Sequence, residues 1–281
     1  VAGVALALAF LAHAAFAREA RGNVDDHIRR DRFEVELWLR LDAQARLDAI
    51  RPMTVNTDIA TGLEESNLRP AGQLLAAGTR TRVETTLGSL NRQLAEGAAD
   101  ILVAIDKDAD IVAQVGGGVP ELNANLRNLP TAMEALQGSE KDALWLRNDV
   151  LFRVVARPVL RGGSLVGAIV YAAEVDDDLT RRLADRLQGP SVAFFRDDAI
   201  IAFTPASGES TAPDRAALAS AVAPARQDPA LASDERTAPR PVGGTGIAVF
   251  ALFHDKPIDG TVGYVVARGL PEATSPLALI G

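Results

Sequence analysis

The sequence predicts an α+β protein in which a long N-terminal helix carries two tandem lobes, each a five-stranded antiparallel sheet with flanking helices. The main observation is an internal repeat. The strand, acidic turn and strand of Val103–Val112 recur in Val192–Ile201, and the pair of strands in Arg157–Val170 is echoed by Lys256–Val266. A repeated order of elements predicts two related lobes, and two copies are too few for a solenoid.

Composition limits the class of protein. The 281 residues are 48% hydrophobic, which is enough apolar surface for two ordinary cores. There is no cysteine, so disulfides, thiolate metal sites and thiol nucleophiles are excluded. The net charge is −8, and a phosphate-binding surface needs a basic face, so nucleic acid is not an expected partner.

Both ends of the sequence are apolar. Residues 1–17 carry no formal charge, and residues 1–20 are expected to be the end of a transmembrane helix or, alternatively, a signal peptide. Residues 271–281 turn apolar and are expected to lead into a second transmembrane helix. Either interpretation places the segment between them outside the cytoplasm.

Residues 21–99 are expected to form a helical stalk and scaffold. Phe33–Leu41 fits a helix but also alternates with period two, and we favour helix because no turn signal interrupts this region for some thirty residues. A second helix is predicted over Thr81–Glu96, with Gly97 as its C-cap. Breaks are predicted at Arg51-Pro52, Gly62 and Arg69-Pro70.

Residues 100–188 are expected to form the membrane-distal lobe. A hairpin, a short helix over Thr131–Gln137, a three-stranded meander and a helix from Asp176 to about Leu187 follow one another. The strands are predicted at Ile101–Ile105, Ile111–Val115, Ala143–Arg147, Val150–Leu160 and Ser164–Glu174.

Residues 189–270 are expected to form a smaller, membrane-proximal lobe. It has a hairpin over Ser191–Phe203, a helix over Asp214–Val222, and closing strands over Gly246–His254 and Thr261–Ala267. The Pro-, Ala-, Ser- and Gly-rich residues 223–244 are predicted to be a long surface loop.

This plan resembles the double Cache sensory domains, which are PAS-like and belong to bacterial transmembrane receptors such as chemoreceptors and two-component kinases. The resemblance covers roughly Thr81 to Arg268 and rests on the order and spacing of elements. The residues that carry it are Leu102–Asp106, Leu144-Trp145, Phe152–Val159 and Gly162–Val170. It implies a small ligand held in the membrane-distal lobe between the sheet and a helical cap, with the output in a signalling domain beyond the second span. The Arg-x-Trp-Tyr pattern of the amino-acid-binding branch is not present, because Trp145-Leu146-Arg147 has the reverse order.

The sequence offers poor material for catalysis or metal binding. His13, His27 and His254 are too scattered for a metal pair or a catalytic dyad, and no G-x-S-x-G elbow is present. The acidic turn Asp106–Asp110 lacks the glycine and the closing glutamate of an EF-hand loop. Aspartates in tight turns need no metal to explain them, so we expect no enzyme activity, no metal and no cofactor.

Five residues of the first lobe are candidates for ligand binding. Arg153 lies between apolar neighbours on a strand and points either to a pocket, where its forked donors suit a carboxylate, or to solvent. Trp145 and Arg147 share a face of the preceding strand, and Tyr171 lies near the end of the next one, each with a core position as the alternative. Asp176 suits a ligand amine but is more simply a helix N-cap.

We therefore expect a ligand-sensing domain that binds a small anionic or zwitterionic molecule in the first lobe and relays a shift to the transmembrane helices, as a homodimer through the long first helix. The alternative is a non-enzymatic periplasmic module for dimerisation or partner-protein interaction without a small ligand.

Overall fold

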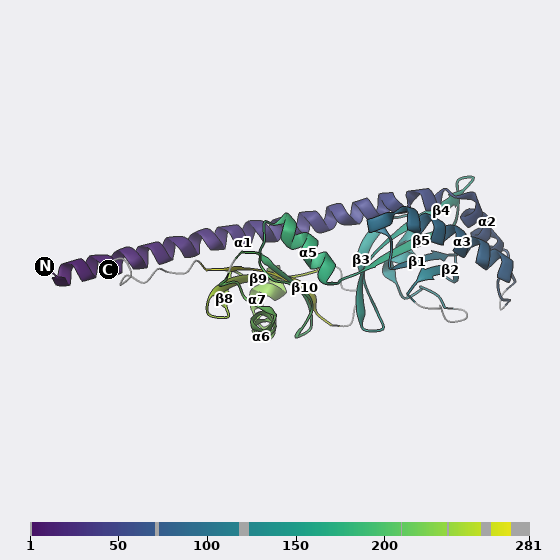
Figure 1. Ribbon diagram of the computed structural model, residues 1–281. Coiled ribbons are helices and arrows are strands. Elements are labelled where there is room, and N and C mark those ends of the chain that lie inside the picture. The colour runs from purple at the N-terminus through teal and green to yellow at the C-terminus, as the bar shows by residue number, and fades with distance from the viewer. Residues whose placement is uncertain are drawn as a thin grey trace. The chain divides into compact units, whose positions relative to one another are not determined.

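The computed structural model describes residues 2–70, 73–117, 124–208, 210–234, 236–253 and 260–270. Clustering of contacts divides the chain into two compact units. Residues 39–175 form one, called the β1–β5 unit, and the described parts of 2–38 and 176–270 form the other, called the β6–β10 unit. Helix α1 contributes residues to both units (Figure 1).

The N-terminal region is helical, as predicted. Helix α1 spans Ala2–Thr54, so the break predicted at Arg51-Pro52 comes two residues after the proline. Helix α2 spans Thr57–Asn67 and α3 spans Ala77–Gln93, followed by a 3₁₀ turn over Ala95–Gly97.

The break predicted at Gly62 is wrong, because Gly62 lies inside α2. This glycine is buried against α3, and a β-carbon on it would come within 2.2 Å of Val83 Cγ2. Glycine is therefore used here for the close approach of two helices, while the chain break comes beyond the end of α2 at Asn67.

The first sheet has five antiparallel strands in the order β2-β1-β5-β4-β3 (Figure 1). Its strands are β1 Ile101–Ile105, β2 Ile111–Gly116, β3 Lys141–Arg147, β4 Val150–Arg161 and β5 Ser164–Glu174. The turns at Asn148-Asp149 and Gly162-Gly163 have positive φ at both residues, as two-residue hairpin turns of type I′ require. Helix α4, Pro130–Ala135, lies between β2 and β3 in the sequence.

The two faces of the first sheet pack against different elements. The face that we call the helical face packs on α1, α2 and α3 and includes Leu102, Val155 and Tyr171. The opposite face, called the α4 face, packs on α4 and the residues before it and includes Val103, Phe152 and Val154. Both faces are thus buried.

The second sheet repeats the first in the order β7-β6-β10-β9-β8, which confirms the duplication predicted from the sequence. Its strands are β6 Ser191–Arg196, β7 Ala199–Thr204, β8 Arg240–Val242, β9 Gly246–Leu252 and β10 Val262–Gly269. Its helices are α5 Asp177–Arg186, α6 Arg215–Arg226 and α7 Pro229–Asp234. The loop predicted over 223–244 is wrong in part, because it contains α7 and the short strand β8. A three-residue strand at a sheet edge, with Pro241 in it, has too few positions to show an alternating pattern.

Candidate functional site

The five candidate residues do not converge in the structure. Strand pairing places Trp145 opposite Phe152 and Leu144 opposite Arg153. Since successive side chains of a strand point to opposite faces, Trp145 and Arg147 belong to the α4 face and Arg153 to the helical face. Tyr171 packs in the cluster of the helical face.

The Arg153 side chain is held by helix α1. It is 6% exposed, and its Nη1 donates to Asp42 Oδ2 at 2.5 Å while Nη2 donates to the Leu39 carbonyl at 2.6 Å. Burial, together with the neighbouring charge of Arg46, lowers the pKa of Arg153 to about 10, against the attraction of Asp42. The guanidinium therefore remains charged at neutral pH, and α1 supplies its hydrogen-bond partners.

Tyr171 is also engaged with the helical layer. Its hydroxyl donates to the Gly97 carbonyl at 2.9 Å, and the guanidinium carbon of Arg46 lies 5.6 Å from its ring centroid. Tyr171 is therefore a core residue, which is the alternative to a ligand-binding role, and its hydroxyl is bonded to the 3₁₀ turn before β1.

Trp145 and Arg147 lie together on the α4 face. The Trp145 ring packs against Phe152 with ring centroids 6.0 Å apart, and the Arg147 guanidinium carbon lies 5.4 Å from the Trp145 ring centroid. Arg147 Nη1 is shielded from solvent yet makes no hydrogen bond within the described chain. A β-carbon at Gly117, where φ is +65°, would lie 3.2 Å from this nitrogen. The guanidinium therefore lies beside the residue that follows β2.

A further polar group of the α4 layer lacks a partner. Thr131, in the first turn of α4, is fully buried, and its Oγ1 makes no hydrogen bond in the part of the chain that the structure describes. A buried hydroxyl without a partner is uncommon, because its desolvation is not offset. The sequence predicted a helix beginning at Thr131 but gave no signal that its hydroxyl would be left unpaired.

Asp176 is the N-cap of α5, as the simpler alternative predicted. Its side chain accepts a hydrogen bond from the Leu179 amide at 2.8 Å, and it belongs to the β6–β10 unit. The carboxylate therefore accepts a hydrogen bond from a free amide of the helix end, and its negative charge interacts favourably with the positive end of the helix dipole.

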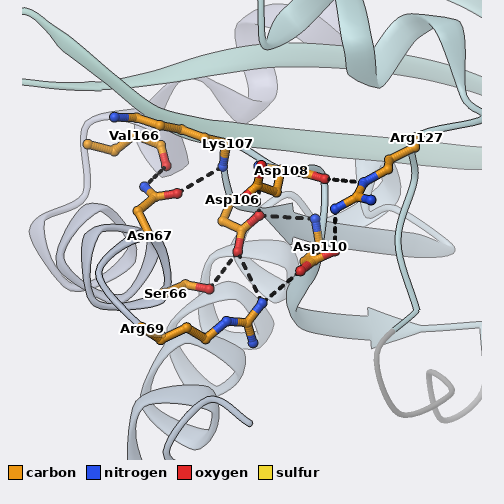
Figure 2. A network of polar contacts seen from close by, with 9 residues as sticks. All are labelled: Ser66, Asn67, Arg69, Asp106, Lys107, Asp108, Asp110, Arg127 and Val166. Atoms are coloured by element: carbon orange, nitrogen blue, oxygen red, sulfur yellow. Dashed lines mark hydrogen bonds and ion pairs between the residues drawn. The ribbon is translucent and has the colours of Figure 1, made fainter. Parts of the chain in front are cut away.

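The acidic turn between β1 and β2 is held by hydrogen bonds within the protein (Figure 2). Asp106 is 2% exposed, and its Oδ1 accepts from the amides of Asp108 and Asp110, each at 3.0 Å. Its Oδ2 accepts from Ser66 Oγ at 2.6 Å and lies 3.5 Å from Arg69 Nη2. Among the described residues, no group of three or more His, Asp or Glu side chains could hold a metal ion.

No protein-family model matches the sequence, and no curated protein is significantly similar to it. Solved structures are similar in fold. One is a domain of a sensory box/GGDEF family protein from Vibrio parahaemolyticus, at 10% identity, with 90% of this chain and 97% of that chain covered and a TM-score of 0.51. Another is the sensor domain of the Vibrio cholerae histidine kinase DctB, at 12% identity, with 92% and 99% covered and a TM-score of 0.50. The chain has a double-Cache-like fold.

The interior of the β6–β10 unit contains packed aromatic side chains. Phe195 and Phe250 are fully buried with ring centroids 6.3 Å apart, and they pack against α6 and α7. On the other face of that sheet, Tyr264 contacts α1 through a hydrogen bond to Glu36 at 3.3 Å. Burial, followed by the charge of Glu36, raises the pKa of Tyr264, so its hydroxyl stays protonated and can donate.

The predicted membrane segments are not tested by these observations. Within the residues that the structure describes, no helix offers a stretch both apolar and long enough to cross a bilayer. The assignment of residues 1–20 to the end of a transmembrane helix or a signal peptide stays a prediction, and residues 271–281 lie outside the described residues.

Proposed function

We propose that this chain is the extracytoplasmic sensory domain of a bacterial membrane signal-transduction receptor. In this proposal the β1–β5 unit binds a small anionic or zwitterionic molecule on its α4 face, as a non-catalytic module. The observation that carries the proposal is the buried Arg147 Nη1, which lacks a hydrogen-bond partner among the described residues and lies beside the Trp145 ring. The duplicated sheet, similar in fold to solved bacterial sensor domains, provides the context.

The chemistry of the α4 face fits a carboxylate. A guanidinium presents forked donors that match the two oxygens of a carboxylate, and a charge-assisted hydrogen bond is about twice as strong as a neutral one. A ligand pocket usually combines an apolar wall with a few polar groups. Here Phe152 and Val154 supply apolar surface, Trp145 supplies an aromatic ring, and Arg147 and Thr131 supply unsatisfied polar groups.

Trp145 and Arg147 are therefore the sequence-predicted residues that we keep in the proposed site. Arg153 and Tyr171 lie on the helical face, and we propose that they fix the sheet to the helices instead of touching the ligand. Asp176 caps α5, and its Oδ1 accepts that hydrogen bond.

The test begins with the intact chain and asks what it binds. Mass spectrometry of the protein after denaturation identifies small molecules that co-purify, and thermal-shift screening uses short mono- and dicarboxylates and amino acids as probes. Calorimetry with the best probe then compares Arg147→Ala with the wild type. Loss of a charge-assisted contact predicts roughly tenfold or more weaker binding.

The matched control is Arg161→Ala, which removes an exposed arginine of the same sheet that pairs with Glu64. Its affinity for the probe should equal that of the wild type. If no carboxylate raises the melting temperature, or if Arg147→Ala binds the probe as tightly as the control, the α4 face is not the binding site.

A second candidate function rests on the surface of α1. Phe33 and Leu37 are spaced by four residues on this helix, lie in the β6–β10 unit and are 59% and 48% exposed. Side chains four apart on a helix share a face, and large exposed apolar groups in a row are typical of a protein interface. We propose that a second copy of the chain covers this row in a parallel homodimer.

Light scattering of the wild type and of Leu37→Glu tests the dimer, with Arg18→Glu, an exposed charge on the same helix, as the control. We expect a dimer that the Leu37 variant alone disrupts. A dimer of this kind, combined with no binding of any probe, would favour a module for dimerisation over a ligand sensor. A monomeric wild type would contradict the dimer.

A further inference from the structure

The edge of the first sheet is a place where chain segments from both of its faces meet. Residues 124–129, which lead into α4, run beside the turn between β1 and β2. The Leu126 amide donates to the Ala109 carbonyl at 2.9 Å, and the Ile111 amide donates to the Ala124 carbonyl at 3.0 Å. The acidic turn is thereby bonded to the segment that covers the α4 face.

Side chains continue this connection around the sheet edge (Figure 2). Arg127 donates through Nε to the Asp108 carbonyl at 2.8 Å, and its Nη2 lies 3.5 Å from Asp110 Oδ1. The other oxygen of the same carboxylate, Oδ2, accepts from Arg69 Nη2 at 2.8 Å. Asp110 thus bridges two guanidinium groups, one from each side of the sheet edge.

Arg69 follows shortly after α2, which ends at Asn67. Just before Arg69, Ser66 donates to the buried carboxylate of Asp106, and Asn67 donates to the Val166 carbonyl at 2.8 Å. Asn67 Oδ1 also accepts from the Lys107 amide at 3.0 Å. The end of α2 is therefore fixed to the acidic turn, and a displacement of that turn must displace the end of α2 or break these bonds.

We propose that the bridge Arg127–Asp110–Arg69 couples the α4 side of the first sheet to helix α2 on the helical face. A bound molecule that moves the segment 124–129 would in this way change the position or stability of α2, which packs on α3 and on the sheet. This role in signalling rests on the proposed function. The coupling itself is a property of the protein without a ligand, and it is tested in that state.

The experiment is hydrogen exchange of the full ligand-free chain, measured at the amides of α2 in wild type, Arg127→Gln, Arg69→Gln and the double variant. Arg127 forms hydrogen bonds and an ion pair with Asn125, Asp108 and Asp110, which lie outside α2, so faster exchange in α2 reports coupling through Asp110. A half-exposed ion pair predicts about two- to fivefold faster exchange of the last turn of α2 in Arg127→Gln. The double variant should resemble Arg69→Gln, because both single changes break the same bridge.

The control is Lys141→Gln, which breaks an ion pair of similar exposure with Glu134 and should leave exchange in α2 unchanged. Unchanged exchange of α2 in Arg127→Gln, or additive effects in the double variant, would overturn the proposal. An equal rise in exchange throughout the chain would overturn it as well, because the contact would then be a general stabiliser. Since no ligand is used, these outcomes are independent of whether the α4 face binds a carboxylate.

Discussion

Replacing Arg153 with alanine should destabilise the β1–β5 unit by about 3 kcal/mol. The side chain is buried and makes two charge-assisted hydrogen bonds, to Asp42 and to the Leu39 carbonyl. Removing one partner of a buried ion pair costs about 3–5 kcal/mol, mainly because the other charge is left unpaired. Asp42 retains Arg46, whose Nε lies 2.8 Å from the same carboxylate, so the low end of that range applies.

The assay is urea unfolding followed by fluorescence of Trp145, in a Trp38→Phe background so that the signal comes from the β1–β5 unit alone. A loss of about 3 kcal/mol corresponds to a fall in melting temperature of roughly 10 °C for a unit of this size. Arg161→Ala on the same strand is the control, because its exposed pair with Glu64 should contribute under about 1 kcal/mol.

Arg153→Met separates charge from packing. The methionine retains much of the apolar stem but leaves Asp42 without Arg153, so it restores the packing and not the ion pair. We therefore expect Arg153→Met to be more stable than Arg153→Ala. If Arg153→Ala unfolds at the same urea concentration as Arg161→Ala, the contacts with α1 do not stabilise the unit and the reasoning fails.

Three further predictions concern single side chains. Gly62→Ala should destabilise the protein by about 1–3 kcal/mol in thermal unfolding, because the new methyl group meets the branched side chain of Val83. Gly78→Ala, on α3, has free space around the new methyl group and should not destabilise it. Adding Val83→Ala to Gly62→Ala should restore part of the lost stability. Burial raises the pKa of Asp31, so this carboxyl stays protonated to higher pH in the folded protein than in the unfolded chain. The free energy of unfolding should therefore fall as pH rises from about 4. In urea titrations at several pH values, Asp31→Asn should make this fall smaller. Asp176→Ala should cost about 0.5–2 kcal/mol and Asp176→Asn much less, since the role of the side chain is to cap α5; equal losses would contradict that role.

The sequence predicted the duplication because each lobe repeats a hairpin and a pair of long strands, whose turns carry strong local signals. It also assigned the faces of β4 correctly, with Arg153 and Val155 on one side and Phe152 on the other. The prediction did not include how the residues of neighbouring strands pair with each other. The two-residue turn at Asn148-Asp149 pairs Leu144 with Arg153, so this arginine faces away from Trp145.

That register was available from the sequence, since a two-residue hairpin fixes the pairing of every position along both strands. The unpaired state of Arg147 and Thr131 was not available in the same way. It depends on which groups of α4, of the residue after β2 and of the sheet come within reach, and neither spacing nor periodicity gives that distance.

In each unit, an arginine of the sheet forms an ion pair with an aspartate of α1. In the β1–β5 unit Arg153 contacts Asp42, and in the β6–β10 unit Arg268 Nε donates to Asp31 Oδ2 at 2.6 Å. Buried ion pairs add little net stability over apolar contacts, but their fixed geometry resists slippage in a way that apolar packing does not. The two arginines are therefore fixed links between each sheet and α1.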